Sequence, residues 1–341
     1  MNLKQLSANL GLSQTTVSRA LNGFPEVNEA TRLRVAEAAR HYNYRPNMRA
    51  KALATGRAMA IGHVIPVSSK HEIVNPIFAD FIAGAGETYS AADYDLVLSV
   101  VSDADEADAY RKLRAKGTVD GVIIHGPRID DSRIALMRDI GLPFVVHGRS
   151  REATLPYSWL DVNNRRAFER ATDFLLDLGH RRIALINGQE FMDFAHRRRI
   201  GYEAALLARD VSPDPVLMRS EEMTEGYGYE SAAQMLRLPN PPTAFLTASL
   251  ISAIGVRRAI EDAGLKMGRD ISVVTHDDEL SYLRNGGAVP IFTATRSSVR
   301  DAGRLAARML LDKIADPAMP IQERLLEAAL VVGQSTGPVR R

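Results

Sequence analysis

The sequence predicts an all-α head of about 60 residues, followed by an α/β body that carries parallel sheets in two lobes. The head shows helical periodicity interrupted by turns that contain Gly and Asn. From Ala60 onward, short runs rich in β-branched residues alternate with longer amphipathic stretches, which is typical of α/β units. Roughly nine such units are too many for one small sheet, so we expect two lobes.

Three helices are expected in the head. The first ends at Gly11, the second follows a cap at Ser13, and the third follows a cap at Asn28. Helical spacing places one apolar face on each helix. The residues expected to face inward are Leu3, Leu6, Leu10, Val17, Ala20, Leu21, Val35, Ala36 and Ala39.

The body contains eight apolar runs that we interpret as fully buried parallel strands. They cover residues 60–66, 95–101, 120–126, 142–148, 181–188, 243–248, 271–277 and 291–296. Helical patterns lie between them, for example in NPIFADFIAGAGETYSAA and RAFERATDFLLDLG. This alternation favours parallel sheets with helices on their faces.

The composition of the 341 residues is that of an ordinary globular protein, with 45% hydrophobic and 25% charged residues. The chain has no cysteine, which excludes disulfides, iron–sulfur clusters and Cys-ligated zinc. It has no apolar run of about 18 residues and no N-terminal signal pattern. We therefore expect a cytoplasmic protein that needs no metal or cofactor.

The charge is distributed unevenly. Residues 1–60 carry nine Lys or Arg and three Glu, a net charge of +6, whereas the rest carries 34 basic and 38 acidic residues, a net charge of −4. A basic head on a mildly acidic body suggests a polyanionic partner at one end. The alternative is an ordinary solvated surface.

The first two helices and the turn at Gly11 have the spacing of a helix-turn-helix motif. The N-terminal side chains of the second helix would then face base edges, and Gln and Thr are suited to read them. Gln14, Thr15 and Ser18 are the base-contact candidates, and Arg19 and Asn22 would reach phosphates. The alternative is a helical hairpin with a polar outer face.

Four blocks resemble the LacI/GalR family of bacterial transcription regulators: SQTTVSRALNG (13–23), VNEATR (27–32), NYRPN (43–47) and AKALATG (50–56). The resemblance implies a homodimer that binds a pseudo-palindromic DNA operator. It also implies a DNA-binding domain over 1–45, a hinge helix over 46–58 and an effector-binding domain over 59–341. The DNA contacts that it implies in the head are Leu3, Ser13, Gln14, Thr15, Thr16, Ser18, Arg19 and Asn22.

The same resemblance explains the short basic connector. Family hinge helices enter the minor groove, and the family's wedge leucine falls on Leu53. Asn47, Ala50 and Lys51 flank it as expected groove or phosphate contacts. The alternative for Leu53 is a buried leucine at a domain junction.

The resemblance extends to about residue 335 and implies a periplasmic-binding-protein-like core with a ligand cleft between its lobes. The first lobe is expected over about 59–160 and 291–322, and the second over about 161–290 and 323–341. Ligands of such sheets bind beyond the carboxyl ends of the strands. The expected sugar contacts are Ser68, Ser69, Phe78, His147, Trp159, Arg198, Ser249, His276 and Asp277.

Three of these contacts come from family motifs. NPIFAD resembles N-P-F-F-A-E and gives Phe78, FAHRRRIGY resembles R-x-x-G-[FYW] and gives Arg198, and ISVVTHDD resembles S-V-V-G-Y-D-D and gives Asp277. The alternatives are core packing for Phe78 and a buried ion pair between the lobes for the other two.

Departures from the family pattern narrow the range of expected ligands. Ser249 replaces a usual Asn-Asp pair, and Arg165 and Arg166 are additional. These features are most similar to the α-glucoside-responsive members found in rhizobial bacteria, which implies sucrose, trehalose or maltose as effector. A phosphosugar held by the two arginines, a purine, and a sugar-binding protein without a regulatory role are the alternatives. An enzyme is not expected, because no nucleophile elbow, phosphate loop or metal-spaced cluster is present.

Overall fold

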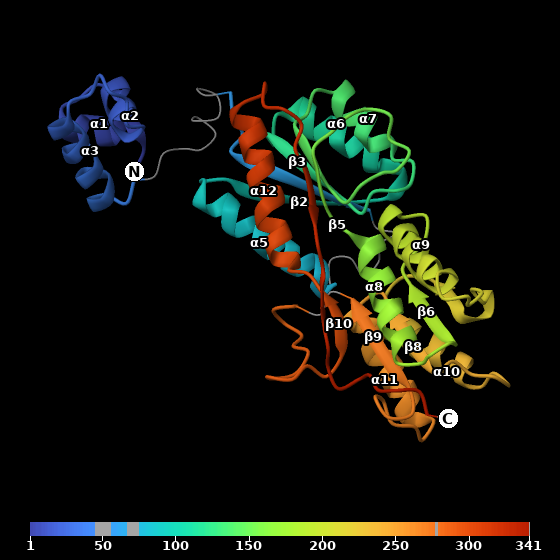
Figure 1. The fold of residues 1–341 in the computed structure, drawn as a ribbon. Coiled ribbons are helices and arrows are strands. Elements are labelled where there is room, and N and C mark those ends of the chain that lie inside the picture. The colour runs from blue at the N-terminus through green and yellow to red at the C-terminus, as the bar shows by residue number, and fades with distance from the viewer. Residues whose placement is uncertain (45–55, 67–74, 277–278, 341) are drawn as a thin grey trace. The chain divides into compact units, whose positions relative to one another are not determined.

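The computed structural model describes residues 1–44, 56–66, 75–276 and 279–340 (Figure 1). The chain forms two compact units, Met1–Met59 and Ala60–Arg341. Each unit has its own hydrophobic core.

The described part of the first unit contains three helices, α1 (Leu3–Leu10), α2 (Gln14–Leu21) and α3 (Glu29–His41). Gly11 ends α1 in the left-handed region at φ 65°. The side chains of Ser13 and Asn28 cap α2 and α3, as predicted. The core consists of Leu6, Leu10, Val17, Ala20, Val27, Val35 and Ala39, which confirms most of the expected inward faces.

Two six-stranded sheets organise the second unit. The first has the order β11-β5-β4-β3-β1-β2, and all of its pairs are parallel. The second has the order β12-β10-β9-β8-β6-β7 and is parallel except for the pair of β10 with β12. The strands are β1 (Ala60–Pro66), β2 (Asp95–Val101), β3 (Gly121–His125), β4 (Phe144–His147), β5 (Trp159–Val162), β6 (Ile183–Asn187), β7 (Met218–Ser220), β8 (Ala244–Thr247), β9 (Ser272–His276), β10 (Thr293–Arg296), β11 (Glu323–Leu326) and β12 (Ala329–Val331).

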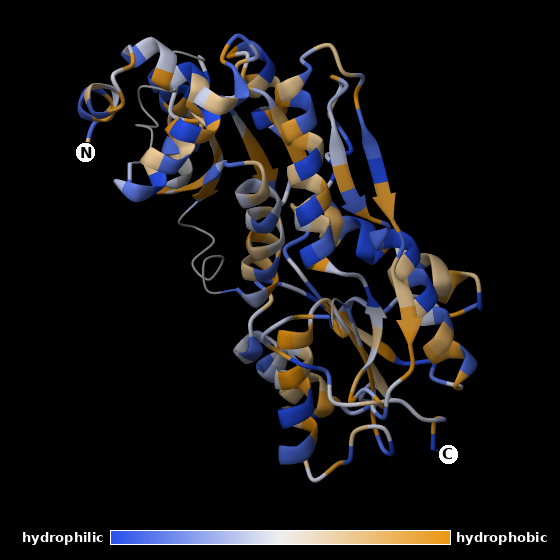
Figure 2. Ribbon diagram, turned by 90° about the vertical axis from the view of Figure 1, so that its left-hand side faces the viewer, coloured by the Kyte–Doolittle hydropathy of each residue, from blue (hydrophilic) through white to orange (hydrophobic). Residues whose placement is uncertain are grey.

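Helices cover the faces of both sheets. In the first lobe α5 and α12 lie side by side against one face, and α6 and α7 lie on the other (Figure 1). In the second lobe α8 and α9 share one core with the sheet, and α10 and α11 share another. The strands are largely hydrophobic, whereas the helices carry both kinds of residue (Figure 2). The helices are α5 (Pro76–Ala91), α6 (Glu106–Lys116), α7 (Ser132–Asp139), α8 (Asn164–Asp177), α9 (Asp193–Leu207), α10 (Glu225–Leu236), α11 (Leu250–Asp262) and α12 (Val299–Ala315), with short 3₁₀ turns η2 (Asp103–Asp105) and η3 (Pro215–Leu217).

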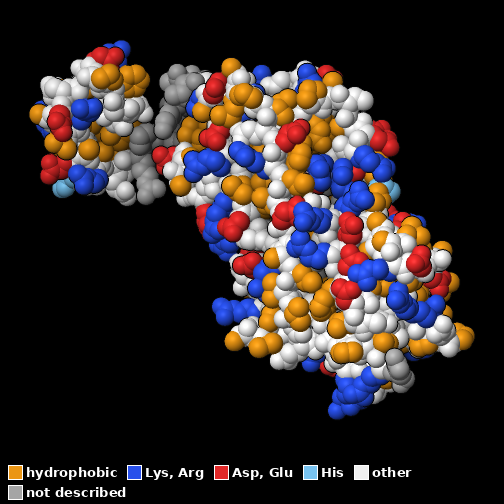
Figure 3. Space-filling model, in the orientation of Figure 1, with side chains coloured by type: hydrophobic (Ala, Val, Ile, Leu, Met, Phe, Trp, Pro, Cys, Tyr) orange, Lys and Arg blue, Asp and Glu red, His pale blue; other side chains and the backbone are white. Residues whose placement is uncertain are grey.

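The surface of this unit mixes both signs of charge. On the face drawn in Figure 3, Lys and Arg side chains are interspersed with Asp and Glu. Among the described residues, no helix has the length and apolar character needed to span a membrane.

The chain passes between the two sheets three times. It leaves the first sheet after Val162, returns to the first lobe after Arg296, and leaves again after Leu326. The boundaries expected at 291 and 323 therefore come a few residues too early. The reason is that β10 pairs with β9 in the second sheet and β11 pairs with β5 in the first.

One strand differs from its predicted environment. The run 95–101 was expected to be fully buried, but β2 is an edge strand paired with β1 alone. Its side chains alternate in exposure, and Leu98 and Val100 are 43% and 49% exposed. The apolar run alone could not reveal this, because edge position depends on strand order.

Candidate functional site

Helix α2 presents a polar outer face. Val17 and Ala20 are buried beneath it, which leaves Gln14, Thr15 and Arg19 exposed. The helix begins at a firm cap, because Ser13 Oγ accepts a hydrogen bond from Thr16 N at 3.0 Å. A capped helix with an exposed polar N-terminal half has the form that enters a major groove.

The other predicted DNA contacts of the head have internal roles as well. Ser13 Oγ and Thr16 Oγ1 share a hydrogen bond of 2.8 Å, and Asn22 Nδ2 donates to Ser18 O at 2.8 Å. Leu3 packs against the core of the head and is partly buried. The hinge residues Asn47, Ala50, Lys51 and Leu53 lie outside the described residues.

In the first lobe, histidine and phenylalanine side chains form a cluster at the ends of neighbouring strands. His125 ends β3, His147 ends β4, and the two are paired in register. Phe78 is 7% exposed and lies edge-on to His125 with ring centres 5.1 Å apart. Phe81 is stacked on His147 at 4.2 Å. The structure therefore brings together Phe78 and His147, two of the predicted ligand contacts, and adds His125 between them.

The loop after β3 faces the second lobe. Asp193 N donates to Pro127 O at 3.0 Å, and Ile129 N donates to Phe191 O at 3.1 Å. Arg133 holds this loop from the other side, because its Nη2 donates to His125 O at 3.1 Å. The cluster around His125 thus lies at the boundary between the lobes.

Arg133 belongs to a buried ion-pair network in the first lobe. Its guanidinium contacts Asp131 at 2.6 Å and Glu106 at 2.9 Å, and all three side chains are at most 12% exposed. These carboxylates, with the neighbouring Tyr110, raise the pKa of Arg133 against the effect of burial. The guanidinium therefore stays charged and rigid under the β3 loop.

In the second lobe, Arg198 is buried, with 5% of its surface exposed. Its Nε donates to Asn164 Oδ1 at 2.7 Å and its Nη1 donates to Ala248 O at 3.0 Å. The rings of Phe168 and Phe194 lie 5.3 and 4.8 Å from the guanidinium carbon. These contacts hold the guanidinium of this predicted ligand residue in one orientation, and its planar shape suits it to bind two adjacent ligand oxygens.

A second polar group joins the two lobes where β5 leads into α8. Asp161 accepts from Arg149 Nε at 2.8 Å and from Asn164 Nδ2 at 3.2 Å. Burial raises the pKa of Asp161, and the charge of Arg149 opposes that effect. Asn164 contacts both Asp161 and Arg198, so one amide links the crossover to the arginine of the second lobe.

Trp159 contacts the polar group of Arg149 and Asp161 and does not belong to the histidine cluster. Strand register pairs Trp159 with Val146 and Leu160 with His147. Neighbouring strand residues point to opposite faces, so Trp159 and His147 lie on opposite sides of the sheet. The Arg149 guanidinium covers the Trp159 ring at 4.8 Å.

The remaining predicted contacts of the second lobe are fully buried. Ser249 Oγ caps α11 by accepting from Ser252 N at 3.2 Å. His276 Nδ1 shares a hydrogen bond of 2.7 Å with Thr295 Oγ1. Ser68, Ser69 and Asp277 lie outside the described residues.

The residues of these groups that sequence reasoning missed include His125, Arg149, Asp161 and Asn164. His125 ends a strand that was predicted correctly, so the rule of carboxyl ends could have found it. Asp161 and Asn164 gave no such signal, because the strand that carries Asp161 is short and was not predicted.

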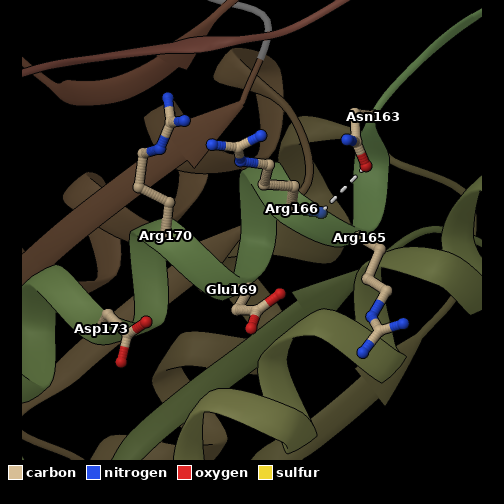
Figure 4. A pocket seen from close by; sticks show the side chains of 6 residues that line it. All are labelled: Asn163, Arg165, Arg166, Glu169, Arg170 and Asp173. Carbon is tan, nitrogen blue, oxygen red and sulfur yellow. Dashed lines mark hydrogen bonds between the residues drawn. The ribbon is translucent and has the colours of Figure 1, made fainter. Parts of the chain in front are cut away.

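Arg165 and Arg166, the candidates for a phosphate site, are exposed on α8. They line a surface hollow with Asn163, Glu169, Arg170 and Asp173, in which both signs of charge occur (Figure 4). Arg166 also lies 3.8 Å from Glu327. The surroundings are thus not those of a dedicated anion site. Within the described ranges, no group of three or more His, Asp or Glu is placed to hold a metal ion.

Each of the two units contains a match to a known family model. Residues 3–47 match the model of the bacterial regulatory proteins of the lacI family, and residues 172–336 match the periplasmic binding protein-like domain. The HTH-type transcriptional regulator AglR of Rhizobium meliloti (strain 1021) is 46% identical over 99% of this chain and 95% of its own length. The transcriptional regulator RafR of Escherichia coli is 35% identical over 81% of this chain and 82% of its own.

Solved structures agree with these matches. The Lac repressor dimer bound to operator and the anti-inducer ONPF has a TM-score of 0.84 and 26% identity, and covers 99% of both chains. A complex of the transcriptional regulator CelR with cellobiose has a TM-score of 0.73 and 27% identity, and covers 98% of this chain and 99% of that one. The predicted fold class is confirmed, and the relatives are named as transcriptional regulators rather than enzymes.

Proposed function

Because the chain belongs to the LacI family of bacterial transcription regulators, we propose that it acts in the cytoplasm as a homodimeric repressor of carbohydrate-utilisation genes. A small α-glucoside, sucrose, trehalose or maltose, binds between the lobes and controls the affinity for operator DNA. The buried Arg198, whose guanidinium is oriented by Asn164 and by the carbonyl of Ala248, is the observation that carries this proposal.

The DNA-binding part of the proposal rests on the outer face of α2. Gln14 and Thr15 read base edges in the major groove, and Arg19 contacts phosphate. A dimer places one such helix on each half of a pseudo-palindromic site. Leu53 of each protomer acts as an apolar wedge in the minor groove, flanked by Asn47, Ala50 and Lys51.

The ligand-binding part rests on the chemistry of the lobe boundary. The rings of Phe78 and the neighbouring histidines offer an apolar platform for the C–H face of a sugar, and Arg198 offers a planar fork for two adjacent oxygens. Asp277 supplies a carboxylate that accepts from sugar hydroxyls. A sugar regulates operator binding if its affinities for two lobe arrangements differ, with a typical coupling of about 1–3 kcal/mol.

Calorimetric titration of the full-length protein with sucrose, trehalose, maltose and a phosphosugar tests the ligand. We expect one neutral α-glucoside to bind, and Asp277→Ala to abolish its effect on DNA binding without weakening DNA binding itself. Loss of both activities would indicate a structural role for Asp277. Binding of the phosphosugar alone would contradict the α-glucoside assignment and would move the site to Arg165 and Arg166.

The wedge has its own test. Duplexes selected from a random pool by the wild-type protein provide the operator, and fluorescence anisotropy measures its affinity. We expect Leu53→Ala to weaken binding, whereas normal binding by this variant would refute the wedge.

A further inference from the structure

Three side chains of the first lobe form a hydrogen-bonded chain that ends at the lobe boundary. Tyr89 Oη lies 3.2 Å from His63 Nε2, and His63 Nδ1 lies 2.8 Å from His125 Nε2. Tyr89 and His63 are buried, with 1% and 0% of their surfaces exposed, whereas His125 is partly exposed. The chain therefore runs from the core beneath α5 to the carboxyl end of β3.

Every member of this chain is neutral near pH 7. Burial lowers the pKa of His63 to about 3 and raises the pKa of Tyr89 far above its usual value. Burial also lowers the pKa of His125, and the nearby His63, His147 and Arg133 lower it further. Each imidazole thus carries one proton, and each ring has one donor nitrogen and one acceptor nitrogen.

The hydroxyl of Tyr89 determines which atom donates and which accepts in each hydrogen bond of this series. Among the described residues its only side-chain hydrogen-bond partner is His63. If His63 Nε2 carried the proton, the buried Tyr89 hydrogen would have no acceptor, and a buried unpaired donor disfavours that arrangement by about tenfold or more. Tyr89 therefore donates to His63 Nε2, His63 Nδ1 donates to His125 Nε2, and the proton of His125 lies on Nδ1.

His125 Nδ1 is the open end of this chain. This nitrogen has no hydrogen-bond partner among the described residues. It is also not fully buried, because the fully buried polar atoms that lack a partner in this part of the chain do not include it. The adjacent Gly126 lies next to the second lobe, because a Cβ built on it would lie 3.8 Å from Met192 Sδ. The rings of Phe78 and Phe81 lie edge-on to the His125 ring, with ring centres 5.1 and 5.0 Å away, and these contacts fix its orientation.

We propose that the chain Tyr89–His63–His125 presents His125 as a fixed N–H donor to an oxygen of a neutral ligand between the lobes. This inference rests on the proposed function, and it specifies that in one ligand contact the protein is the hydrogen-bond donor and the ligand is the acceptor. His125 selects an acceptor atom on the ligand. Tyr89 and His63 are positioning residues, which act through the tautomer of His125 without touching the ligand.

Long-range ¹H–¹⁵N NMR on full-length protein with labelled histidine distinguishes protonated from bare ring nitrogens. The spectra of His125→Gln and His63→Gln assign the two rings among the eight histidines. We expect the wild type to carry its protons on Nδ1 of His63 and of His125. A proton on Nε2 of His125 would overturn the proposal, and this result needs neither a ligand nor a correct effector.

Tyr89→Phe removes the group that sets the direction. We expect His125 to become a mixture of tautomers and the affinity for the α-glucoside that binds the wild type to fall about 3- to 10-fold. Tyr202→Phe is the matched control, since its buried hydroxyl donates to Ile183 O at 2.7 Å in the other lobe. It should change neither readout.

The outcomes separate the two proposals. A shifted tautomer with unchanged sugar affinity in Tyr89→Phe would overturn the selecting role of His125. If no α-glucoside binds the wild type, the proposed function fails, and the NMR spectrum still decides which nitrogen of His125 is the donor.

Discussion

Lowering the pH from 7 to 5 should destabilise the first lobe through His63. This side chain is fully buried, and burial lowers its pKa to about 3, whereas a histidine in the unfolded chain titrates near 6.5. The stabilising contribution is therefore complete above the unfolded pKa and is lost as the pH falls from 6.5 toward 3. Proton uptake by the unfolded chain costs about 1.4 kcal/mol per pH unit well below 6.5.

The loss from His63 alone is about 2 kcal/mol between pH 7 and pH 5. Urea unfolding measures it, with the fluorescence of Trp159 as the signal. Trp159 is the single tryptophan of the chain and lies in the first sheet next to β4. We expect the free energy of unfolding of the wild type to fall by about 2 kcal/mol more than that of His63→Gln over this range.

The two proteins are compared by how much their free energy of unfolding changes between pH 7 and pH 5. Any cost of the substitution that does not depend on pH therefore cancels. His41→Gln in the head is the control, because His41 is exposed and belongs to the other unit. If the wild type and His63→Gln lose the same free energy between pH 7 and pH 5, His63 takes up its proton in the folded state and the reasoning is refuted.

Four further substitutions test a helix cap, the packing of two helical glycines and the buried ion-pair network. Ser13→Ala removes the cap of α2 and should destabilise the head by about 1 kcal/mol, measured as a lower melting temperature of the head with sugar binding retained. Gly201→Ala should cost about 1–3 kcal/mol in thermal unfolding, because its Cβ would meet Arg165 O at 2.0 Å, whereas Gly86→Ala, with open space, should stabilise the protein. Arg133→Gln should cost about 3–5 kcal/mol in urea unfolding, since it leaves the buried carboxylates of Asp131 and Glu106 without their cationic partner, and a loss below 1 kcal/mol would contradict their burial.

Local signals account for what could be predicted from the sequence. The caps at Ser13 and Asn28 and the strands β1 and β2 were predicted at their exact positions. The short strands β5, β7, β11 and β12 were not predicted as strands. Strands β5, β7 and β11 contain charged residues, which interrupt the kind of apolar run by which the four-residue strands β4, β8 and β10 were recognised. Their partners, which are distant in sequence, decide where the chain crosses between the lobes.

The residues of the candidate site also divide into those that local sequence patterns predict and those that depend on distant partners. Phe78, His147 and Arg198 follow recognisable motifs or strand ends, and the structure places all three near the lobe boundary. The face on which Trp159 lies depends on the register of β5 against β4, which no local pattern contains. The hydrogen-bonded chain behind His125 likewise depends on a tyrosine 36 positions earlier in the sequence.

Hydrogen bonds between the lobes set the scale on which a ligand must act. Besides the two backbone bonds of the β3 loop, Arg151 Nη1 lies 2.7 Å from His196 Nε2, and Ser281 N donates to Asp80 Oδ2 at 2.6 Å. At about 0.5–1.5 kcal/mol each, these four bonds alone amount to about 2–6 kcal/mol, and the bond between Asn164 and Asp161 adds to them. Typical coupling between two sites is about 1–3 kcal/mol, so a ligand can supply only part of the free energy that holds this arrangement. Regulation by a small sugar therefore requires a second lobe arrangement that keeps or replaces some of these bonds.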